Sequence, residues 1–145
     1  MNERLKELYK THILTKSKED TYFHKLEGAT HVIEAYNPMC GDKYTLYLKV
    51  ASDKVEQASF EGFGCAISRA STAVLVEKVM GKSFDEIDEL VNVFLEIINE
   101  NSEKEVGSLS SDESLQAFAG ARQYPERLQC AGLSWQELEK ADLNK

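Results

Sequence analysis

Two alternating runs, separated by two residues suited to a tight turn, constrain the fold of this chain most strongly. Residues 43–51 and 54–61 each alternate as half-buried strands do, and Ser52-Asp53 between them predicts a tight hairpin. With the short apolar run 31–36 before them, we expect a three-stranded antiparallel meander with one face that needs a cover. Strict alternation gives one face of the middle run Leu46, Leu48 and Val50, and in the last run it groups Glu56 with Ala58 and Phe60, opposite Val55.

Amphipathic helices are predicted to supply that cover. Residues 3–14 carry apolar side chains at three- and four-residue spacing, and residues 66–80 form a broad apolar stripe that ends at Gly81. A capping-box signature at Ser83 starts the next helix, and Pro125 suits the first turn of a last one.

Two polar stretches lack such periodicity. Residues 14–30 are predicted to be a loop, and residues 99–114, with only Val106 and Leu109 as aliphatic side chains, are predicted to be a mobile, solvated spacer. Strands first and helices afterwards favour an α+β fold: a small three-stranded antiparallel sheet packed against helices, in a single domain over residues 1–145.

Charge and hydropathy exclude several kinds of partner. Lys and Arg number 17 against 25 Asp and Glu, for a net charge of −8, and no basic cluster offsets this, so nucleic acid and anionic membranes are not expected partners. The charge also fits a role in solubility alone. No apolar run approaches the roughly 18 residues of a membrane span, and the N-terminus lacks the apolar stretch of a signal peptide. We therefore expect a cytoplasmic protein.

The chain has three cysteines, and this odd number without a secretion signal disfavours a disulfide framework. Buried inert thiols, a metal site and one reactive thiol are the alternatives. Cys40 and Asp42 share a face if the backbone is extended, and two such anions repel each other unless a cation lies between them. The alternative is a turn after Pro38 that happens to contain a cysteine.

The other two cysteines belong to predicted helices. Cys65 follows a glycine-rich exit from the last strand and falls at a helix N-terminus, where the helix dipole favours a thiolate; the alternative is a small apolar cap. Cys130 lies one turn into the last helix, with Arg127 three residues before it to stabilise a thiolate or persulfide; the alternative is ordinary packing. Three thiols and one carboxylate suit zinc or an iron–sulfur cluster, although the paired CxxC spacing of structural zinc sites is absent.

Three sequence blocks together resemble the U-type iron–sulfur assembly proteins, which comprise IscU, SufU and the NifU N-terminal domain. The resemblance extends from about residue 35 to residue 140 and implies a three-stranded antiparallel sheet packed on helices, with a metal site formed by Cys40, Asp42, Cys65 and Cys130. The blocks are Asn37-Pro-Met-Cys40-Gly-Asp42, Glu61-Gly-Phe-Gly-Cys65-Ala-Ile-Ser68, and Arg127-Leu-Gln-Cys130 with Leu133-Ser-Trp135.

Within this family the chain is most similar to the SufU branch. IscU proteins have histidine where this chain has Gln129, and they have a shorter gap than the 65 positions between Cys65 and Cys130. SufU proteins usually have lysine there, so glutamine departs from both branches. The LPPVK-like motif that implies an Hsp70-type partner is absent at residues 124–127, and the family's N-terminal HYxNPRNxG-like segment is absent at residues 16–28.

The resemblance implies an iron–sulfur cluster assembly protein. In this hypothesis a zinc-dependent sulfur carrier receives persulfide sulfur from a SufS-type cysteine desulfurase, with Cys40 as the acceptor and Arg127 as the stabiliser of the sulfur anion. A scaffold that holds iron or a transient [2Fe–2S] cluster for a downstream acceptor is the close variant. One alternative is a zinc-stapled protein-interaction module without sulfur chemistry. Another is a cysteine-nucleophile enzyme, which lacks a well-placed histidine base.

Overall fold

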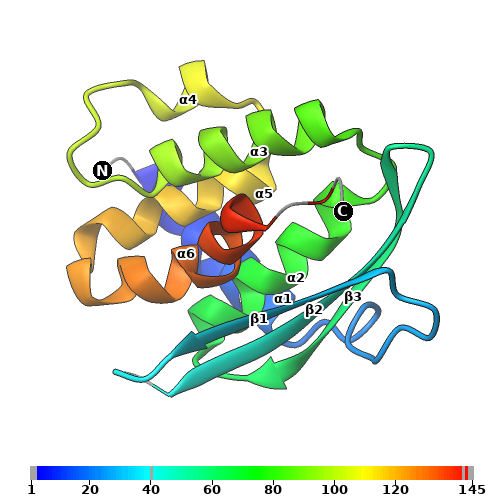
Figure 1. Cartoon of the computed structure of the whole chain (residues 1–145). Coiled ribbons are helices and arrows are strands. Elements are labelled where there is room, and N and C mark those ends of the chain that lie inside the picture. Colours follow the sequence, from blue (N-terminus) through cyan, green and yellow to red (C-terminus); the bar gives the residue numbers. More distant parts are fainter. Residues whose placement is uncertain (1–2, 40, 142, 144–145) are drawn as a thin grey trace.

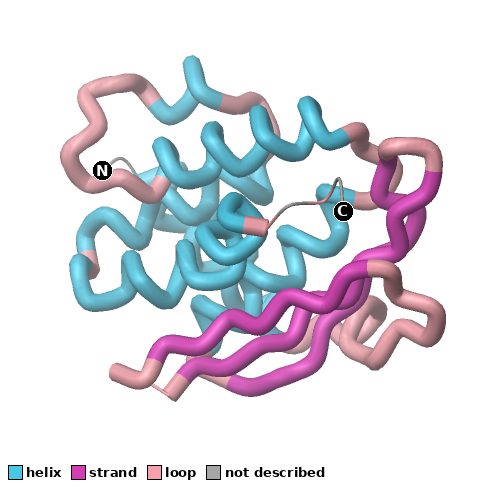
Figure 2. Tube along the Cα trace, in the orientation of Figure 1, coloured by secondary structure: helices cyan, strands magenta, loops and turns pink. Residues whose placement is uncertain are grey.

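The computed structural model describes residues 3–39, 41–141 and 143. It confirms the α+β prediction, with a three-stranded antiparallel sheet and helices gathered on one side of it (Figures 1 and 2). Among the described residues, no helix combines the length and the apolar character needed to cross a bilayer. In chain order the elements are α1 (Glu3–Ser17), β1 (His31–Asn37), β2 (Asp42–Ala51), β3 (Lys54–Phe63), α2 (Ala66–Val79), α3 (Phe84–Ile97), α4 (Val106–Leu109), α5 (Glu113–Gln116), the 3₁₀ helix η1 (Ala117–Gln123) and α6 (Pro125–Lys140).

The strands lie in the order β1-β2-β3, as the predicted meander requires. Ser52 and Asp53 form the predicted tight turn, with φ values of 54° and 61° that two-residue hairpin turns demand. Strict alternation is wrong at the start of β3, because a β-bulge lies there: Val50 pairs with Val55, and the extra residue is Glu56. Val55 is consequently buried on the same face as Ala58, whereas Glu56 is exposed.

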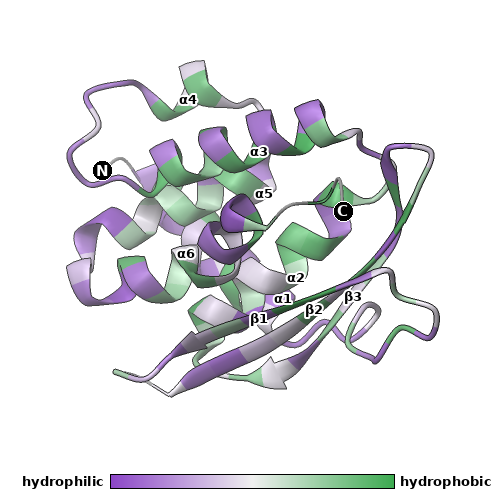
Figure 3. Cartoon of the chain, viewed as in Figure 1, coloured by the Kyte–Doolittle hydropathy of each residue, from purple (hydrophilic) through white to green (hydrophobic). Residues whose placement is uncertain are grey.

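Helices α2 and α6 cover the apolar face of the sheet: α2 packs on β3, and α6 packs on β1. The face they cover is formed by side chains that are almost completely buried, among them Tyr44, Leu46, Leu48 and Phe60. Figure 3 shows apolar colour along α2, which the other elements enclose, and a mixture of apolar and polar colour on α3 and α6. The core continues beyond the sheet, where the rings of Phe94 and Trp135 stack with centroids 4.0 Å apart.

The helix boundaries follow the sequence signals closely. Gly81 ends α2 with a φ of 81°, and the capping box of α3 is present, because Ser83 and Glu86 each bond the other's backbone N–H. The predicted loop 14–30 begins later than expected, since α1 continues to Ser17. Within that loop Phe23 forms a bridge to β3.

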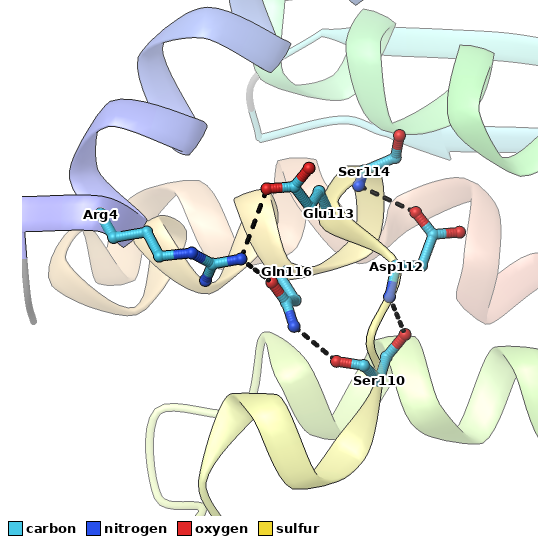
Figure 4. A network of polar contacts seen from close by, with 6 residues as sticks. All are labelled: Arg4, Ser110, Asp112, Glu113, Ser114 and Gln116. Atoms are coloured by element: carbon cyan, nitrogen blue, oxygen red, sulfur yellow. Dashed lines mark hydrogen bonds and ion pairs between the residues drawn. The ribbon is translucent and has the colours of Figure 1, made fainter.

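The polar spacer 99–114 is not structureless as predicted, because α4 and the start of α5 lie within it and Val106 is buried. Side chains attach this region to the rest of the fold (Figure 4). Arg4 of α1 donates a hydrogen bond to Gln116 at 2.9 Å, and Asp112 forms an ion pair with Lys78 of α2 at 2.9 Å. Helices of a single turn are too short for hydrophobic periodicity to reveal.

Candidate metal centre

The turn between β1 and β2 carries the first cysteine block. Asn37 pairs with Asp42 across the hairpin, and the Gly41 N–H donates to the Asn37 carbonyl at 2.8 Å. Gly41 has a φ of 78°, so the backbone at Gly41 is not extended, which fits the alternative of a turn after Pro38. Cys40 itself lies outside the described residues.

Cys65 is the N-cap residue of α2, as predicted. Its sulfur accepts the Ser68 N–H at a donor–acceptor distance of 3.5 Å, so the thiol takes the place of the usual capping oxygen. The preceding Gly64 has no room for a side chain: a Cβ there would lie 2.5 Å from Asp42 Oδ1 and 2.6 Å from Tyr44 Oη. The glycine therefore lets the helix start approach β2.

Asp42 and Cys130 complete a compact cluster with Cys65. Asp42, at the start of β2, is 2% exposed and accepts the Cys65 N–H on Oδ1 at 3.0 Å. Cys130 lies in α6 and is 4% exposed. One ligand atom from each residue lies within 4.8 Å of the other two. Segments that are 23 and 65 positions apart in sequence thus converge on one point.

The donor set of this cluster fits a zinc ion. Two cysteine sulfurs and one carboxylate oxygen are ligands that zinc takes in proteins, and structural zinc sites have four of them. Burial, a hydrogen bond to Asp42 and the charge of Cys65 all raise the pKa of the Cys130 thiol. Each group becomes an anion when it ionises, so a cation is the partner that makes their close approach favourable.

A cleft of about 540 Å³ opens beside Cys65, which is the member of the cluster that lines it. Arg127, at the first turn of α6, is exposed in its wall, and the neighbouring Cys65 charge raises the pKa of its guanidinium, with a smaller contribution from Cys130. The arginine that sequence reasoning paired with Cys130 therefore interacts most strongly with Cys65. The remaining lining residues are Tyr9, Ala66, Ile67, Tyr124 and Glu126.

Sequence reasoning missed the residues that surround the cluster. Tyr9 of α1 lies over the cleft with its ring stacked on Tyr124, and burial raises its pKa to about 12. Tyr44 and Ser68 form a buried hydrogen bond of 2.8 Å directly behind Cys65. The only signal for Tyr44 was its place two residues after Asp42, on the same face of β2.

The chain has relatives along almost its whole length. The family model described as the NifU-like N-terminal domain matches residues 8–141. The iron–sulfur cluster assembly scaffold protein IscU of Streptococcus pyogenes serotype M1 is 33% identical over 141 residues, which cover 95% of this chain and 84% of that protein. The zinc-dependent sulfurtransferase SufU of Bacillus subtilis is 36% identical over 109 residues, covering 75% of this chain and 72% of the relative.

Solved structures agree with these sequence matches. A crystal structure from Fervidobacterium islandicum AW-1, described as an iron–sulfur cluster assembly scaffold protein for the SUF system, superposes with a TM-score of 0.82 at 33% identity. The alignment covers 93% of this chain and 96% of that chain. Sequence and fold lead to the same assignment: the chain belongs to the family of NifU-like N-terminal domains.

Proposed function

We propose that this chain is an iron–sulfur cluster assembly protein that accepts persulfide sulfur at a zinc-dependent site. The observation that carries the proposal is the convergence of Asp42, Cys65 and Cys130, whose ligand atoms lie within 4.8 Å of one another. The family's relatives support it, because they include both scaffold proteins and a zinc-dependent sulfurtransferase.

Asp42, Cys65 and Cys130 are the proposed ligands, together with Cys40. Cys40 is two positions before Asp42 in the sequence, so a fourth donor is close to the cluster along the chain. Zinc, when bound, would keep the thiols as thiolates at neutral pH. Asp42 is the weakest of these ligands for zinc, since the softer thiolates bind it more strongly.

Cys40 is the proposed sulfur acceptor. Its thiolate attacks the terminal sulfur of a persulfide on the partner enzyme; a new S–S bond forms on Cys40, and the partner's cysteine leaves as a thiolate. Atoms and electrons balance without an added oxidant. The backbone supports this choice of sulfur, because Cys65 caps one helix and Cys130 lies within another, which restricts the movement of both sulfurs.

Arg127 is proposed to stabilise the sulfur anion during transfer. Its guanidinium is exposed in the cleft and interacts with Cys65 and Cys130, so its charge is available both to the cluster and to an incoming group. Arginine keeps this charge at every physiological pH.

The proposed partner is a SufS-type cysteine desulfurase, and a downstream iron–sulfur acceptor would receive the product. Cytoplasmic conditions suit this chemistry, since thiols there stay reduced, and in the part of the chain that the structure describes Cys65 and Cys130 are thiols that form no disulfide. A scaffold that holds iron or a [2Fe–2S] cluster on the same ligands is the close variant.

Metal analysis and sulfur labelling test this proposal. We expect about one zinc per chain after aerobic purification, and labelled sulfur on Cys40 when the protein is mixed with a SufS-type desulfurase and cysteine. Arg127→Ala should slow transfer while zinc is retained; Lys140→Ala, which removes a cation from the far end of α6, is the matched control. A metal-free protein with freely titratable thiols would exclude the centre. Zinc without any sulfur transfer would favour the zinc-stapled interaction module.

A further inference from the structure

A chain of two hydroxyl groups leads from the interior of the sheet to the Cys65 sulfur. Tyr44 Oη and Ser68 Oγ are 2.8 Å apart, and both side chains are almost completely buried. Ser68 Oγ lies 3.7 Å from Cys65 Sγ and 3.1 Å from the Cys65 carbonyl oxygen, while the Ser68 N–H points to the sulfur at 3.5 Å. In the thiol form the Cys65 S–H donates to Ser68 Oγ and the Ser68 hydroxyl donates to the Cys65 carbonyl, so the Ser68 backbone N–H and the Ser68 side-chain oxygen both contact this sulfur.

The hydroxyl groups of Tyr44 and Ser68 are closely packed. A Cβ at Gly64 would collide with the oxygens of Ser68, Tyr44 and Asp42, so these three polar groups surround a position where only hydrogen fits. Ser68 is fixed in the first turn of α2, and Tyr44 projects from the same face of β2 as Asp42. The hydroxyl pair is thus enclosed between two of the proposed ligands.

We propose that Ser68, oriented by Tyr44, is a positioning residue that makes Cys65 the anchored and less nucleophilic thiolate of the centre. This inference rests on the proposed metal site. When Cys65 is a thiolate, the Tyr44 hydroxyl can donate to Ser68 Oγ, and the Ser68 proton can turn from the Cys65 carbonyl to the sulfur 3.7 Å away. A thiolate is a stronger acceptor than a neutral carbonyl, so the charged sulfur attracts that proton together with the Ser68 N–H.

In the thiolate form the sulfur would accept two hydrogen bonds, from the Ser68 N–H and from the Ser68 hydroxyl, and these have a chemical consequence. They stabilise electron density on Cys65, which lowers its tendency to attack an electrophile, and they hold the sulfur in one direction toward the metal. Which sulfur acts as the acceptor then depends on the hydrogen bonds that each sulfur accepts as well as on the backbone element that carries it. Ser68 and Tyr44 together suppress reaction at Cys65, although the cleft makes its surroundings accessible.

Thr72, one helical turn after Ser68, provides a matched control. Its hydroxyl is equally buried and donates to the Ser68 carbonyl at 2.8 Å, but its other neighbour is Ser134, and neither bond involves a cysteine. Thr72→Val therefore removes a buried hydroxyl from the same helix without removing a donor to sulfur.

The test uses the full chain loaded with cobalt(II) in place of zinc. We expect Ser68→Ala to shift the sulfur-to-cobalt charge-transfer band to lower energy and to weaken metal binding about tenfold. In the zinc-loaded protein, alkylation of Cys65 by iodoacetamide, followed by peptide mass spectrometry, should become several-fold faster. Tyr44→Phe should shift the band in the same direction by less, and Thr72→Val should leave the band and the alkylation rate as in the wild type.

The outcomes separate the two proposals. If the wild type binds no cobalt, the metal centre and this inference both fall. If the wild type binds cobalt while Ser68→Ala and Tyr44→Phe match Thr72→Val in spectrum and in Cys65 alkylation, only the positioning role is overturned. Should Ser68→Ala not fold, Tyr44→Phe decides alone, because it leaves every atom of α2 in place.

Discussion

Two groups of polar side chains involve α2 and α6, and they differ in how their charges and hydrogen bonds are matched. The inner group is neutral: Trp135 Nε1 donates to Ser71 Oγ at 2.9 Å, and the hydroxyls of Thr72 and Ser134 lie 2.8 Å apart. The outer group comprises Asp42, Cys65 and Cys130, and every member becomes an anion on ionisation. Helices α2 and α6 therefore carry the inner, structural cluster and, together with β2, the candidate metal centre.

The difference shows how a candidate ligand-binding site can be distinguished from a polar cluster that only stabilises the fold. In the inner group each donor has an acceptor within the protein, so the cluster adds to stability and needs no ligand. In the outer group, acidic side chains from three distant segments are brought within 4.8 Å, an arrangement that a cation stabilises. Changes to the outer group should alter metal binding and stability together, whereas changes to the inner group should alter stability alone.

Removal of the metal from the outer group should lower the stability of the fold more than any other change considered for the two groups. A ligand present at a thousand times its dissociation constant stabilises a fold by about 4 kcal/mol, and for a chain of this size we expect the melting temperature to fall by roughly 10 °C on chelation. Differential scanning calorimetry with and without a chelator measures the shift. Cys65→Ser and Cys130→Ser should each lower both the zinc content and the melting temperature, and their response to chelator should be reduced. A zinc-loaded wild type whose melting temperature ignores the chelator would contradict this.

A methyl group at Gly64 should cause the next largest loss of unfolding free energy. Its Cβ would lie 2.5 Å from Asp42 Oδ1 and 2.6 Å from Tyr44 Oη, so β2 and the start of α2 must separate. We expect Gly64→Ala to cost about 3 kcal/mol of unfolding free energy and to reduce the zinc content.

Gly107→Ala is the control for this change, because a Cβ at Gly107, in α4, meets no atom within 4 Å. It should leave zinc content unchanged and stability equal or slightly higher. Urea titration and metal analysis of both variants measure the difference, and equal stability of the two would show that the space around Gly64 relaxes freely.

The variant Ser71→Ala tests the inner group with the same two measurements, urea titration and metal analysis. It removes the hydroxyl that accepts the Trp135 ring N–H and donates to the Ala131 carbonyl, so we expect a loss of about 1 kcal/mol in unfolding free energy. Zinc content and the cobalt spectrum should not change, since neither bond reaches Asp42, Cys65 or Cys130. A variant that loses metal would show that the two groups are one network.

Much of this arrangement could be predicted from the sequence. Alternation located the strands, Ser52-Asp53 the hairpin, and Gly81 the end of α2. The meeting of Asp42, Cys65 and Cys130 could be expected from local signals only in combination with the family resemblance, because each cysteine alone also fits ordinary packing.

Other features depend on contacts between distant segments and could not be predicted. The bulge at Glu56 exists only in relation to the register of β2, so alternation within β3 cannot reveal it. Ser68 and Tyr44 are 24 positions apart, and their hydrogen bond depends on how closely Gly64 lets α2 approach the sheet. The helices α4 and α5 have four residues each, too few for a periodic pattern.

The smallest loss of unfolding free energy is expected outside both polar groups, where Arg4 of α1 contacts α5. Arg4 donates to Gln116 at 2.9 Å and pairs with Glu113 at 3.4 Å, but the side chains of Arg4 and Glu113 are 55% and 59% exposed. Water competes for such contacts, so Arg4→Ala should cost only about 0.5 kcal/mol in unfolding free energy. Backbone amides of residues 110–116 should exchange faster with deuterium, because their attachment to α1 is lost.

Lys6→Ala is the control for that change, since Lys6 of α1 pairs only with Glu3 in the same helix, at 3.7 Å, among the contacts that the structure describes for its side chain. It removes the same charge and should leave exchange at residues 110–116 as in the wild type. Neither variant should alter zinc content, because Arg4, Lys6 and their partners neither belong to the cysteine cluster nor line the cleft beside it. Equal exchange in both variants would mean that the other contacts of this region, including the Lys78–Asp112 pair, hold it without Arg4.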